Sequence, residues 1–143
     1  MSVEENKALI RRFFTEIDES PDPGILDEFV APDFVDHNPS PGCTPDLDGL
    51  KQAYAMFVEG SPGYHVIEDM VAEGDKVVTR VTGYGTHAGE LFGLLATGRE
   101  FSTSGIAIHR IADGKIVEHW NVVDFFAVLQ QLGALPAEMQ AHA

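Results

Sequence analysis

The apolar residues of the chain change their spacing near residue 64. They recur every three or four positions before it and alternate with polar residues after it. The first spacing is the period of one helical face, and alternation is the period of a strand. The first helical face is carried by Leu9, Ile10, Phe13, Phe14 and Ile17. Ser2 followed by Glu5 forms a capping box, which predicts that this helix begins beside Ser2.

Two further helices are expected before the strands. The segment P-D-P-G at 21–24 ends the first helix, and a short second helix then stops before Pro32. This second helix carries Ile25, Leu26 and Phe29. Residues 33–42 are rich in Pro, Asn and Gly and indicate a short extended piece that runs into a loop. A third helix is predicted over 46–59, and its apolar face is Leu47, Leu50, Tyr54, Phe57 and Val58.

The second half of the chain predicts strands joined by tight turns. The expected strands are 65–72, 76–86, 100–111 and 115–124. E-G-D at 73–75 and A-D-G-K at 112–115 are turn signals, and a Gly-rich apolar linker occupies 88–98. A last helix is predicted over 125–132 with Gly133 as its stop, and the tail 134–143 is expected to fray.

Helices first and antiparallel strands afterwards are the order of an α+β fold, and 143 residues fit a single domain over 1–143. The first helices expose too much apolar surface to stand alone, so the antiparallel sheet is expected to curl around them. Gly83, Gly85 and Gly105 lie inside strands, where each indicates a bend, a bulge or room for a ligand. A curled sheet closed by helices predicts a cone with a pocket.

The last hairpin predicts which side chains face that pocket. With Asp113 and Gly114 as the turn, Ala112 pairs with Lys115, and a regular register follows from there. The face assigned to the pocket is then Gly105, Ala107, His109, Glu118, Trp120, Val122 and Asp124. His119 has the opposite parity and is expected outside.

Asp124 is the leading candidate for acid–base chemistry. It follows the strand that carries Trp120 and precedes the apolar residues Phe125 and Phe126. A carboxylate in apolar surroundings is costly to ionise, so its pKa is expected to rise, as in many functional sites. Aspartate is also a favoured N-cap for a following helix, and one group can serve both purposes.

Histidines add further polar groups to the predicted cavity. His37 lies where an apolar segment meets a loop, His87 ends a strand face that carries glycines, and His109 lies on the pocket face. A single histidine of this kind is more often structural, whereas several beside a carboxylate indicate chemistry, because imidazole titrates near neutrality. The sequence contains no H-x-x-x-H, H-x-H or C-x-x-C spacing, so no metal site is expected.

Composition restricts the expected partners. The formal net charge is −14, which argues against nucleic acid and anionic membrane surfaces, since both need a basic patch. Cys43 is the only cysteine and is interpreted as a loop thiol. No apolar run approaches the roughly 20 residues of a membrane span. The start M-S-V-E-E-N lacks a signal-peptide pattern, so a cytoplasmic location is expected.

Longer motifs add a family resemblance. They are A-P-D-F-V-D-H-N-P at 31–39, A-E-G-D-K-V-V-T-R at 72–80, G-T-H-A-G at 85–89, T-G-R-E-F at 97–101, H-R-I-A-D-G-K-I-V-E-H-W at 109–120, V-V-D at 122–124 and Q-Q-L-G at 130–133. On these motifs the chain resembles the SnoaL-like polyketide cyclases of the nuclear transport factor 2-like (cystatin-like) superfamily, from about residue 4 to 133. The resemblance implies a cone-shaped α+β barrel in a homodimer packed sheet to sheet, with no metal or organic cofactor.

The resemblance also assigns residues. In the family's true cyclases a pocket aspartate is the general acid–base of an intramolecular aldol ring closure, and Asp124 occupies the position that looks like it. His37, His87 and Trp120 fall in motif positions that line the pocket. His109 stands where relatives often carry an aromatic residue such as Phe, and here it is grouped with the residues that bind substrate.

The predicted mechanism has Asp124 move the proton while His87 or His37 donates a hydrogen bond to the developing oxyanion. The apolar walls for a small hydrophobic carbonyl compound are Trp120, Phe13, Phe14, Met56 and Phe57. The same groups suit an isomerase, a lyase, a hydrolase or a non-catalytic ligand-binding homodimer, and the sequence leaves these alternatives open. The residues expected to face outward into a dimer contact are Ile106, Ile108, Val117 and Val123.

Overall fold

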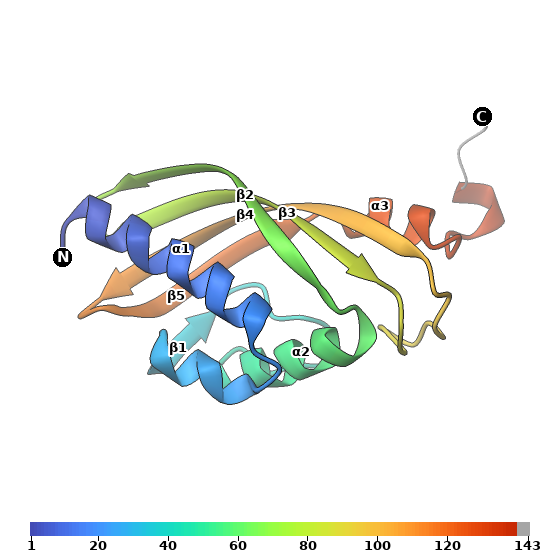
Figure 1. Ribbon diagram of the computed structural model, residues 1–143, viewed down its shortest axis with the longest axis horizontal. Helices are drawn as coiled ribbons and strands as arrows, with labels where there is room; N and C mark the ends of the chain where they lie inside the picture. The colour runs from blue at the N-terminus through green and yellow to red at the C-terminus, as the bar shows by residue number, and fades with distance from the viewer. Residues whose placement is uncertain (140–143) are drawn as a thin grey trace.

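The helix that follows Ser2 is α1 (Val3–Glu19), and it begins at the expected cap. The Ser2 hydroxyl accepts a hydrogen bond from the Glu5 backbone N–H at 3.1 Å, and the Glu5 carboxylate accepts one from the Ser2 N–H at 3.4 Å. The computed structural model describes residues 1–139. In it α1 lies against the sheet (Figure 1). Ile10, Phe13 and Phe14 are buried, so the helical face predicted from the sequence is the face that α1 buries.

The next two helices keep the predicted order but differ in type. The second is a 3-10 helix, η1 (Pro23–Glu28), capped by Asp22. Six residues that begin with a proline form two tight turns of a 3-10 helix, whereas stable α-helices are usually longer. The third, α2 (Leu47–Gly60), follows Asp46, whose carboxylate accepts the Gly49 N–H at 2.9 Å.

The C-terminal segment packs further than expected. The helix α3 (Phe125–Gln131) is followed by Gly133, whose φ of 71° is the left-handed conformation that ends many helices. A short 3-10 helix, η2 (Ala137–Met139), comes next, and Leu135 before it is buried. The tail is therefore anchored at Leu135 instead of fraying from 134, while residues 140–143 lie outside the described residues.

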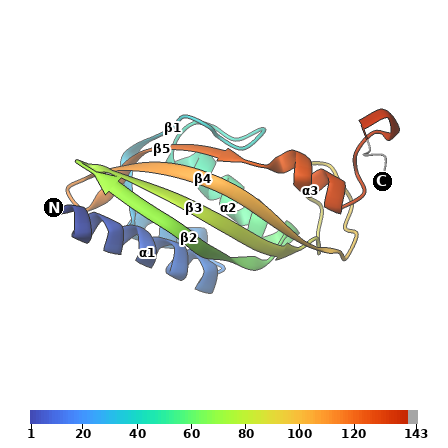
Figure 2. The same cartoon turned by 90° about the horizontal axis from the view of Figure 1, so that it is seen from above.

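Five strands form one sheet in the order β1-β5-β4-β3-β2 (Figure 2). They are β1 (Val30–Asp36), β2 (Gly63–Glu73), β3 (Lys76–Thr86), β4 (Glu100–Ala112) and β5 (Lys115–Val123). The four later strands pair antiparallel as expected, but β1 pairs with β5 in parallel. The sheet is therefore mixed. Local pattern cannot show this, because the two paired strands are separated by most of the chain.

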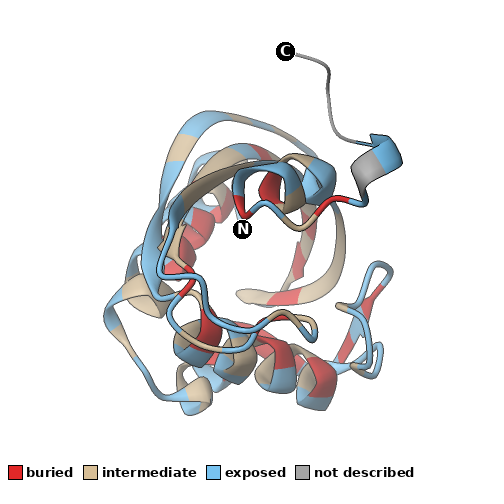
Figure 3. Ribbon diagram, turned by 90° about the vertical axis from the view of Figure 1, so that its right-hand side faces the viewer, coloured by how far each residue is buried: buried red, intermediate tan, exposed pale blue. Residues whose placement is uncertain are grey.

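The sheet curves over α1 and α2, which lie on its concave side (Figure 1). It keeps two free edges, at β1 and β2, so it is an open curved sheet and not the closed barrel that the resemblance implied. The buried residues gather on the ribbon segments that face the inside of this curve (Figure 3). The core joins α1 and η1 to the sheet, and its most deeply buried members are Ile10, Leu26, Phe29, Val77 and Ile116.

The hairpin between β4 and β5 contains one irregularity that decides the site. Ala112 pairs with Lys115 across Asp113 and Gly114, as predicted. Ile111 then pairs with Ile116, but Arg110 pairs with Glu118, so one extra residue is inserted in β5. Such a β-bulge moves every later residue of the strand to the other face. The predicted register beyond the bulge is therefore wrong.

The consequences of the bulge are visible in the cross-strand residue pairs that follow it along β5. His109 pairs with His119, and Ile108, not Ala107, pairs with Trp120. Val122, predicted to face inward, is 75% exposed. His119, predicted to face outward, lies on the concave side with His109.

Candidate functional site

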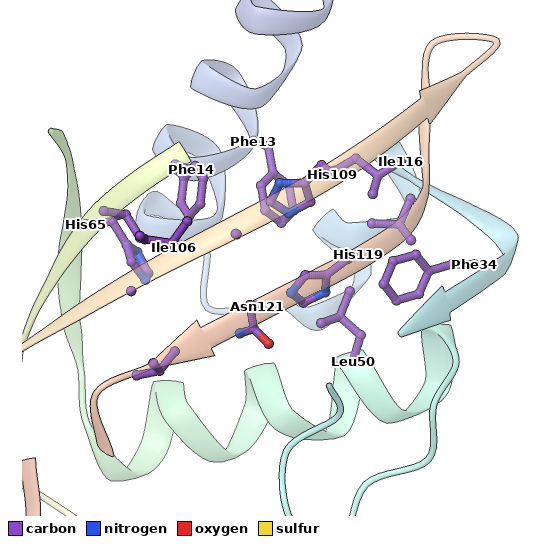
Figure 4. A pocket seen from close by; sticks show the side chains of 15 residues that line it. Phe13, Phe14, Phe34, Leu50, His65, Ile106, His109, Ile116, His119 and Asn121 are labelled. Atoms are coloured by element: carbon purple, nitrogen blue, oxygen red, sulfur yellow. The ribbon is translucent and has the colours of Figure 1, made fainter. Parts of the chain in front are cut away.

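A cavity of about 190 Å³ lies between α1 and the concave face of the sheet (Figure 4). Its walls are mostly apolar. The apolar side chains include Phe13, Phe14, Val30, Phe34, Leu50, Val81, Ile116 and Val123. The polar side chains that line it are His65, His109, His119 and Asn121. An apolar chamber with a few convergent polar groups is the usual form of a small-molecule site.

His109 is held neutral by its surroundings. Its side chain is 4% exposed, and its ring packs edge to face against Phe13 with centroids 5.8 Å apart. Burial, and then the neighbouring His119, lower the pKa of His109 to about 3. Its Nδ1 is sealed from solvent and has no hydrogen-bond partner among residues 1–139. At neutral pH this imidazole is therefore an uncharged ring inside an apolar wall.

His119 lies beside His109 and has a carboxylate behind it. The two rings stack with centroids 5.1 Å apart, and His119 also stacks on Phe34 at 6.0 Å. Its Nδ1 is 3.7 Å from Oδ1 of Asp36, a buried carboxylate that also accepts the Asn38 N–H at 2.9 Å. Burial lowers the pKa of His119, and Asp36 opposes that effect.

The pairing of β1 with β5 creates this contact. Asp36 and His119 are partners in the parallel register, so the backbone brings the carboxylate to the imidazole. Next to them, the Asn121 backbone N–H donates to Oδ1 of Asn38 at 2.9 Å, which ties the end of β5 to the loop after β1. The Asn121 side chain lines the cavity and carries both a donor and an acceptor.

His65 forms a second histidine–carboxylate pair at the cavity. Its Nδ1 lies 2.6 Å from Oδ1 of Asp18, and its backbone N–H donates to Oδ2 of the same residue at 2.7 Å. The ring also packs at a tilt on Phe14, with centroids 5.4 Å apart. It occupies space above Gly83, where an added Cβ would approach the ring to 3.7 Å and the Thr103 methyl to 3.1 Å. Gly83 thus gives room to a neighbouring side chain.

Three of the residues predicted for the site, Phe13, Phe14 and His109, line the cavity. Trp120 lies on the outer face instead, because the bulge reverses β5, and His37, in the loop after β1, lies beside it. Their rings stack in parallel with centroids 4.5 Å apart, and Nε2 of His37 lies 2.8 Å from the Glu118 carboxylate. Hydrogen bonds from His37 and Arg110 hold the pKa of Glu118 below its ordinary value.

His87 is fully buried, but it anchors the 88–98 segment and does not line the cavity. Its Nδ1 accepts the Thr97 N–H at 3.3 Å and lies 3.0 Å from the Thr97 hydroxyl, while its Nε2 donates to the Leu94 carbonyl at 3.2 Å. Above this anchor, Phe92 has a φ of 50°, a strained value for a bulky residue. Its ring fits between Phe57 and Phe125, at 5.7 and 5.0 Å.

The remaining predicted residues lie away from the cavity lining. Phe57 contacts the 88–98 segment, and Met56 beside it on α2 is half-buried. Asp124 is exposed, and its carboxylate accepts the Ala127 N–H at 3.1 Å, so its predicted role as the cap of α3 is confirmed. Its catalytic role stays a prediction.

Four functional candidates were not found from the sequence: His119, Asp36, His65 and Asp18. His119 was assigned to the wrong face because nothing in K-I-V-E-H-W marks the bulge. Asp36 precedes His37 in the D-H-N motif, but only the β1–β5 pairing shows that Asp36 faces inward. Asp18 and His65 are 47 positions apart, so no local pattern joins them.

Among residues 1–139 no cluster of three or more His, Cys, Asp or Glu side chains is arranged to hold a metal ion. The helices in the same range include none that is long and apolar enough to cross a membrane.

Comparison with known proteins places the chain in a family. Residues 8–132 match the family model described as SnoaL-like polyketide cyclase. The chain is 36% identical over 115 residues to aklanonic acid methyl ester cyclase DauD of Streptomyces sp. (strain C5), covering 76% of this chain and 67% of that protein.

Two solved structures share the fold over nearly their whole length. TsrD from Streptomyces laurentii matches with a TM-score of 0.84 and 31% identity, covering 94% of this chain and 99% of that one. IdmH from Streptomyces antibioticus matches with a TM-score of 0.77 and 32% identity, covering 90% and 98%. With the family model matched over residues 8–132, the chain belongs to the SnoaL-like polyketide cyclases.

Proposed function

We propose that this protein binds a small hydrophobic carbonyl compound in the cavity and catalyses an intramolecular aldol ring closure. Membership of the family and a relative named as a cyclase of aklanonic acid methyl ester support the reaction class. The observation that carries the proposal is the position of His119, a cavity-lining imidazole backed by the buried carboxylate of Asp36. Such a group is equipped to move a proton in an apolar chamber.

The volume of the cavity limits what it encloses. An apolar cavity of about 150 Å³ holds benzene. A cavity of about 190 Å³ therefore takes one ring with its polar substituents. A larger substrate of the kind named for the relatives would place its reacting end inside and extend the remainder outward.

In the proposed reaction His119 acts as the base. Asp36 lies on the Nδ1 side of the ring, so Nε2, which has no partner among the described residues, is the nitrogen free to meet a substrate. Nε2 removes a proton from the carbon beside a carbonyl, and the electron pair of the broken C–H bond remains on the substrate as the enolate. The enolate carbon bonds to a second carbonyl carbon, and the resulting alkoxide takes the proton back from His119. Asp36 stabilises the imidazolium in between.

The carbonyl oxygen needs donors while it carries charge, and His109 and Asn121 are placed to supply them. An unpaired buried N–H is rarer than an unpaired acceptor, so the partnerless Nδ1 of His109 is assigned the lone pair and Nε2 the proton. A neutral imidazole N–H can polarise a carbonyl in this way. The Asn121 amide offers a second donor from β5.

Turnover of aklanonic acid methyl ester, followed by chromatography as a product of unchanged mass, tests the proposal. His119→Gln is expected to lower kcat by about 10²-fold or more with a small change in KM. Asp69→Asn, which removes a surface ion pair with Arg80, serves as the control and is expected to keep full turnover. Loss of turnover in Asp124→Asn with full turnover in His119→Gln would instead assign the acid–base role to Asp124.

We also propose that the protein is a homodimer that packs through the convex face of the sheet. Val122 on β5 is 75% exposed on that face, and its pairing partner Ile106 on β4 is 51% exposed and also borders the cavity. The stacked rings of Tyr64 and Tyr84, at 5.2 Å, extend the apolar surface onto β2 and β3. Val123, expected in this contact, lines the cavity instead, because the bulge gives its place to Val122.

A further inference from the structure

The Asp18–His65 pair is a second polar group at the cavity that the proposed reaction does not use. Asp18 is at the end of α1, and its two carboxylate oxygens accept the backbone N–H and the ring Nδ1 of His65 at 2.7 and 2.6 Å. Both contacts come from one side chain, so the position and the rotation of the imidazole are fixed together. The side chain of Asp18 is 17% exposed and that of His65 38%, so the contact is partly open to solvent.

This contact also fixes the proton of the neutral ring. A carboxylate only accepts hydrogen bonds, so Nδ1 at 2.6 Å from Asp18 carries the hydrogen. The lone pair of the neutral imidazole is then on Nε2. That nitrogen has no partner among residues 1–139, and the ring lines the cavity above Gly83. His65 therefore presents an oriented acceptor to whatever occupies the cavity.

The acceptor is distant from the groups assigned to the carbonyl. His65 lies on β2, whereas His109 lies on β4 and Asn121 on β5, two and three strand spacings away, or roughly 10 and 14 Å along the sheet. Figure 4 shows the rings of His65 and His109 on different sides of the same chamber. A ligand that contacts His65 and the carbonyl donors needs an acceptor at the side of His109 and Asn121 and a hydrogen-bond donor at the other end of its ring.

We propose that His65, oriented by Asp18, is a specificity-determining residue that accepts a hydrogen bond from a hydroxyl group of the substrate. The substrate class is then an aromatic ketone that carries a free hydroxyl on the side of the ring away from the reacting carbonyl. This inference rests on the proposed carbonyl site, and it adds a requirement that the proposed reaction does not contain.

Binding of three single-ring ketones tests it: para-hydroxyacetophenone, para-methoxyacetophenone and acetophenone, each titrated by calorimetry at pH 8. A methoxy group has no hydrogen to donate, so it leaves Nε2 unpaired. His65 is partly solvated, so the expected preference of the wild-type chain for the hydroxyl over the methoxy compound is about tenfold. Dissociation constants are the readout, so turnover is not needed.

Asp18→Asn is the decisive variant. The Asn oxygen can still accept the His65 backbone N–H, but its amide group then donates to Nδ1 and moves the ring proton to Nε2. Nε2 becomes a donor, which can donate to a methoxy oxygen as well as to a hydroxyl oxygen. The variant is therefore expected to bind the hydroxyl and methoxy compounds about equally. Glu16→Gln is the matched control, since Glu16 is a surface carboxylate of the same helix paired with Arg12 at 3.0 Å. It should keep the tenfold ratio.

His65→Leu provides a second route if Asp18→Asn does not fold, because it removes the acceptor itself and should also abolish the preference. A tenfold ratio that survives in either variant overturns the inference. Equal binding of the three ketones by the wild-type chain refutes the inference alone and leaves the carbonyl site standing. Binding of none of them refutes the carbonyl site, and the role of His65 falls with it.

Discussion

At the scale of single residues, burial sets the charge of the cavity. His109 and His119 share one apolar chamber, and burial lowers the pKa of both. Only His119 has a carboxylate close enough to offset this, at 3.7 Å. The two rings are therefore suited to different tasks, one as a permanently neutral donor and the other as a group that gains and loses a proton.

The pKa of His109 predicts a pH dependence of stability. The pKa is about 3 in the folded chain and about 6.5 in the unfolded chain, so between these values the unfolded chain binds the extra proton. The free energy of unfolding then keeps its full value above pH 6.5, as far as His109 determines it, and falls as the pH drops toward 3. At about 1.4 kcal/mol per unit, the loss at pH 4 is about 3 kcal/mol.

His109→Phe checks this, because the substitution keeps an aromatic ring and removes the titrating group. Urea unfolding at pH 7 and pH 4 should show that the wild-type chain loses about 3 kcal/mol more than the variant. The carboxylates titrate in both proteins, so their contribution to the stability loss cancels when the two proteins are compared. Equal losses in the two proteins would mean that His109 is not buried in its neutral form.

At the scale of elements, a bulge and an anchored loop place the functional side chains. The bulge adds one residue to β5 and so brings His119 and Asn121 inside while Trp120 moves out. The 88–98 segment is fixed by His87 from below and by Phe92 between Phe57 and Phe125 from above. The strained backbone at Phe92 is tolerated because these contacts hold it.

If His87 is an anchor, its loss should loosen one segment. His87→Ala removes the partner of the Thr97 N–H and the Leu94 carbonyl, and we expect a loss of roughly 2–4 kcal/mol in stability. Amide exchange in 88–98 should accelerate more than elsewhere. Leu95→Ala, in the same segment but exposed, is the control and should change stability by less than about 0.5 kcal/mol. Unchanged exchange with lost turnover would support the catalytic role predicted for His87.

At the scale of the whole molecule, the proposed ligand site lies on the concave face of the sheet and the proposed dimer contact on the convex face. Beside Ile106 and Val122 lie charged groups of both signs, because Arg80 is the β3 partner of Ile106 and forms an ion pair with Asp69. Against this association stands a formal net charge of −14 on each chain. Repulsion between two such chains is screened by salt, so the apolar contact should dominate at physiological ionic strength.

Sedimentation at tens of micromolar should therefore report a dimer whose dissociation constant falls as salt is raised. The variant Val122→Glu places a charge at an exposed position of β5 outside the cavity lining and should give a monomer with an intact cavity. Leu95→Glu adds one charge at an exposed position away from the sheet and should remain dimeric. A wild-type monomer under these conditions would contradict the proposed assembly.

The amino-acid sequence by itself determined the elements and their order. The capping box at Ser2, the helical period through Phe13 and Phe14, and the turn at Asp113 and Gly114 are local signals, and each of them is found where it was predicted. The family was also readable from motifs spread over most of the chain. These features depend on residues a few positions apart, whose interactions are the same in any fold that contains them.

Only the tertiary structure decided which polar groups share the cavity. The bulge beyond Arg110, the parallel pairing of Asp36 with His119 and the contact of Asp18 with His65 each join residues through the sheet and not through local sequence. A strand alternates sides with a period of two, so one inserted residue reverses every assignment beyond it. Sequence pattern carries no record of that insertion, because either register places apolar residues on both faces of β5.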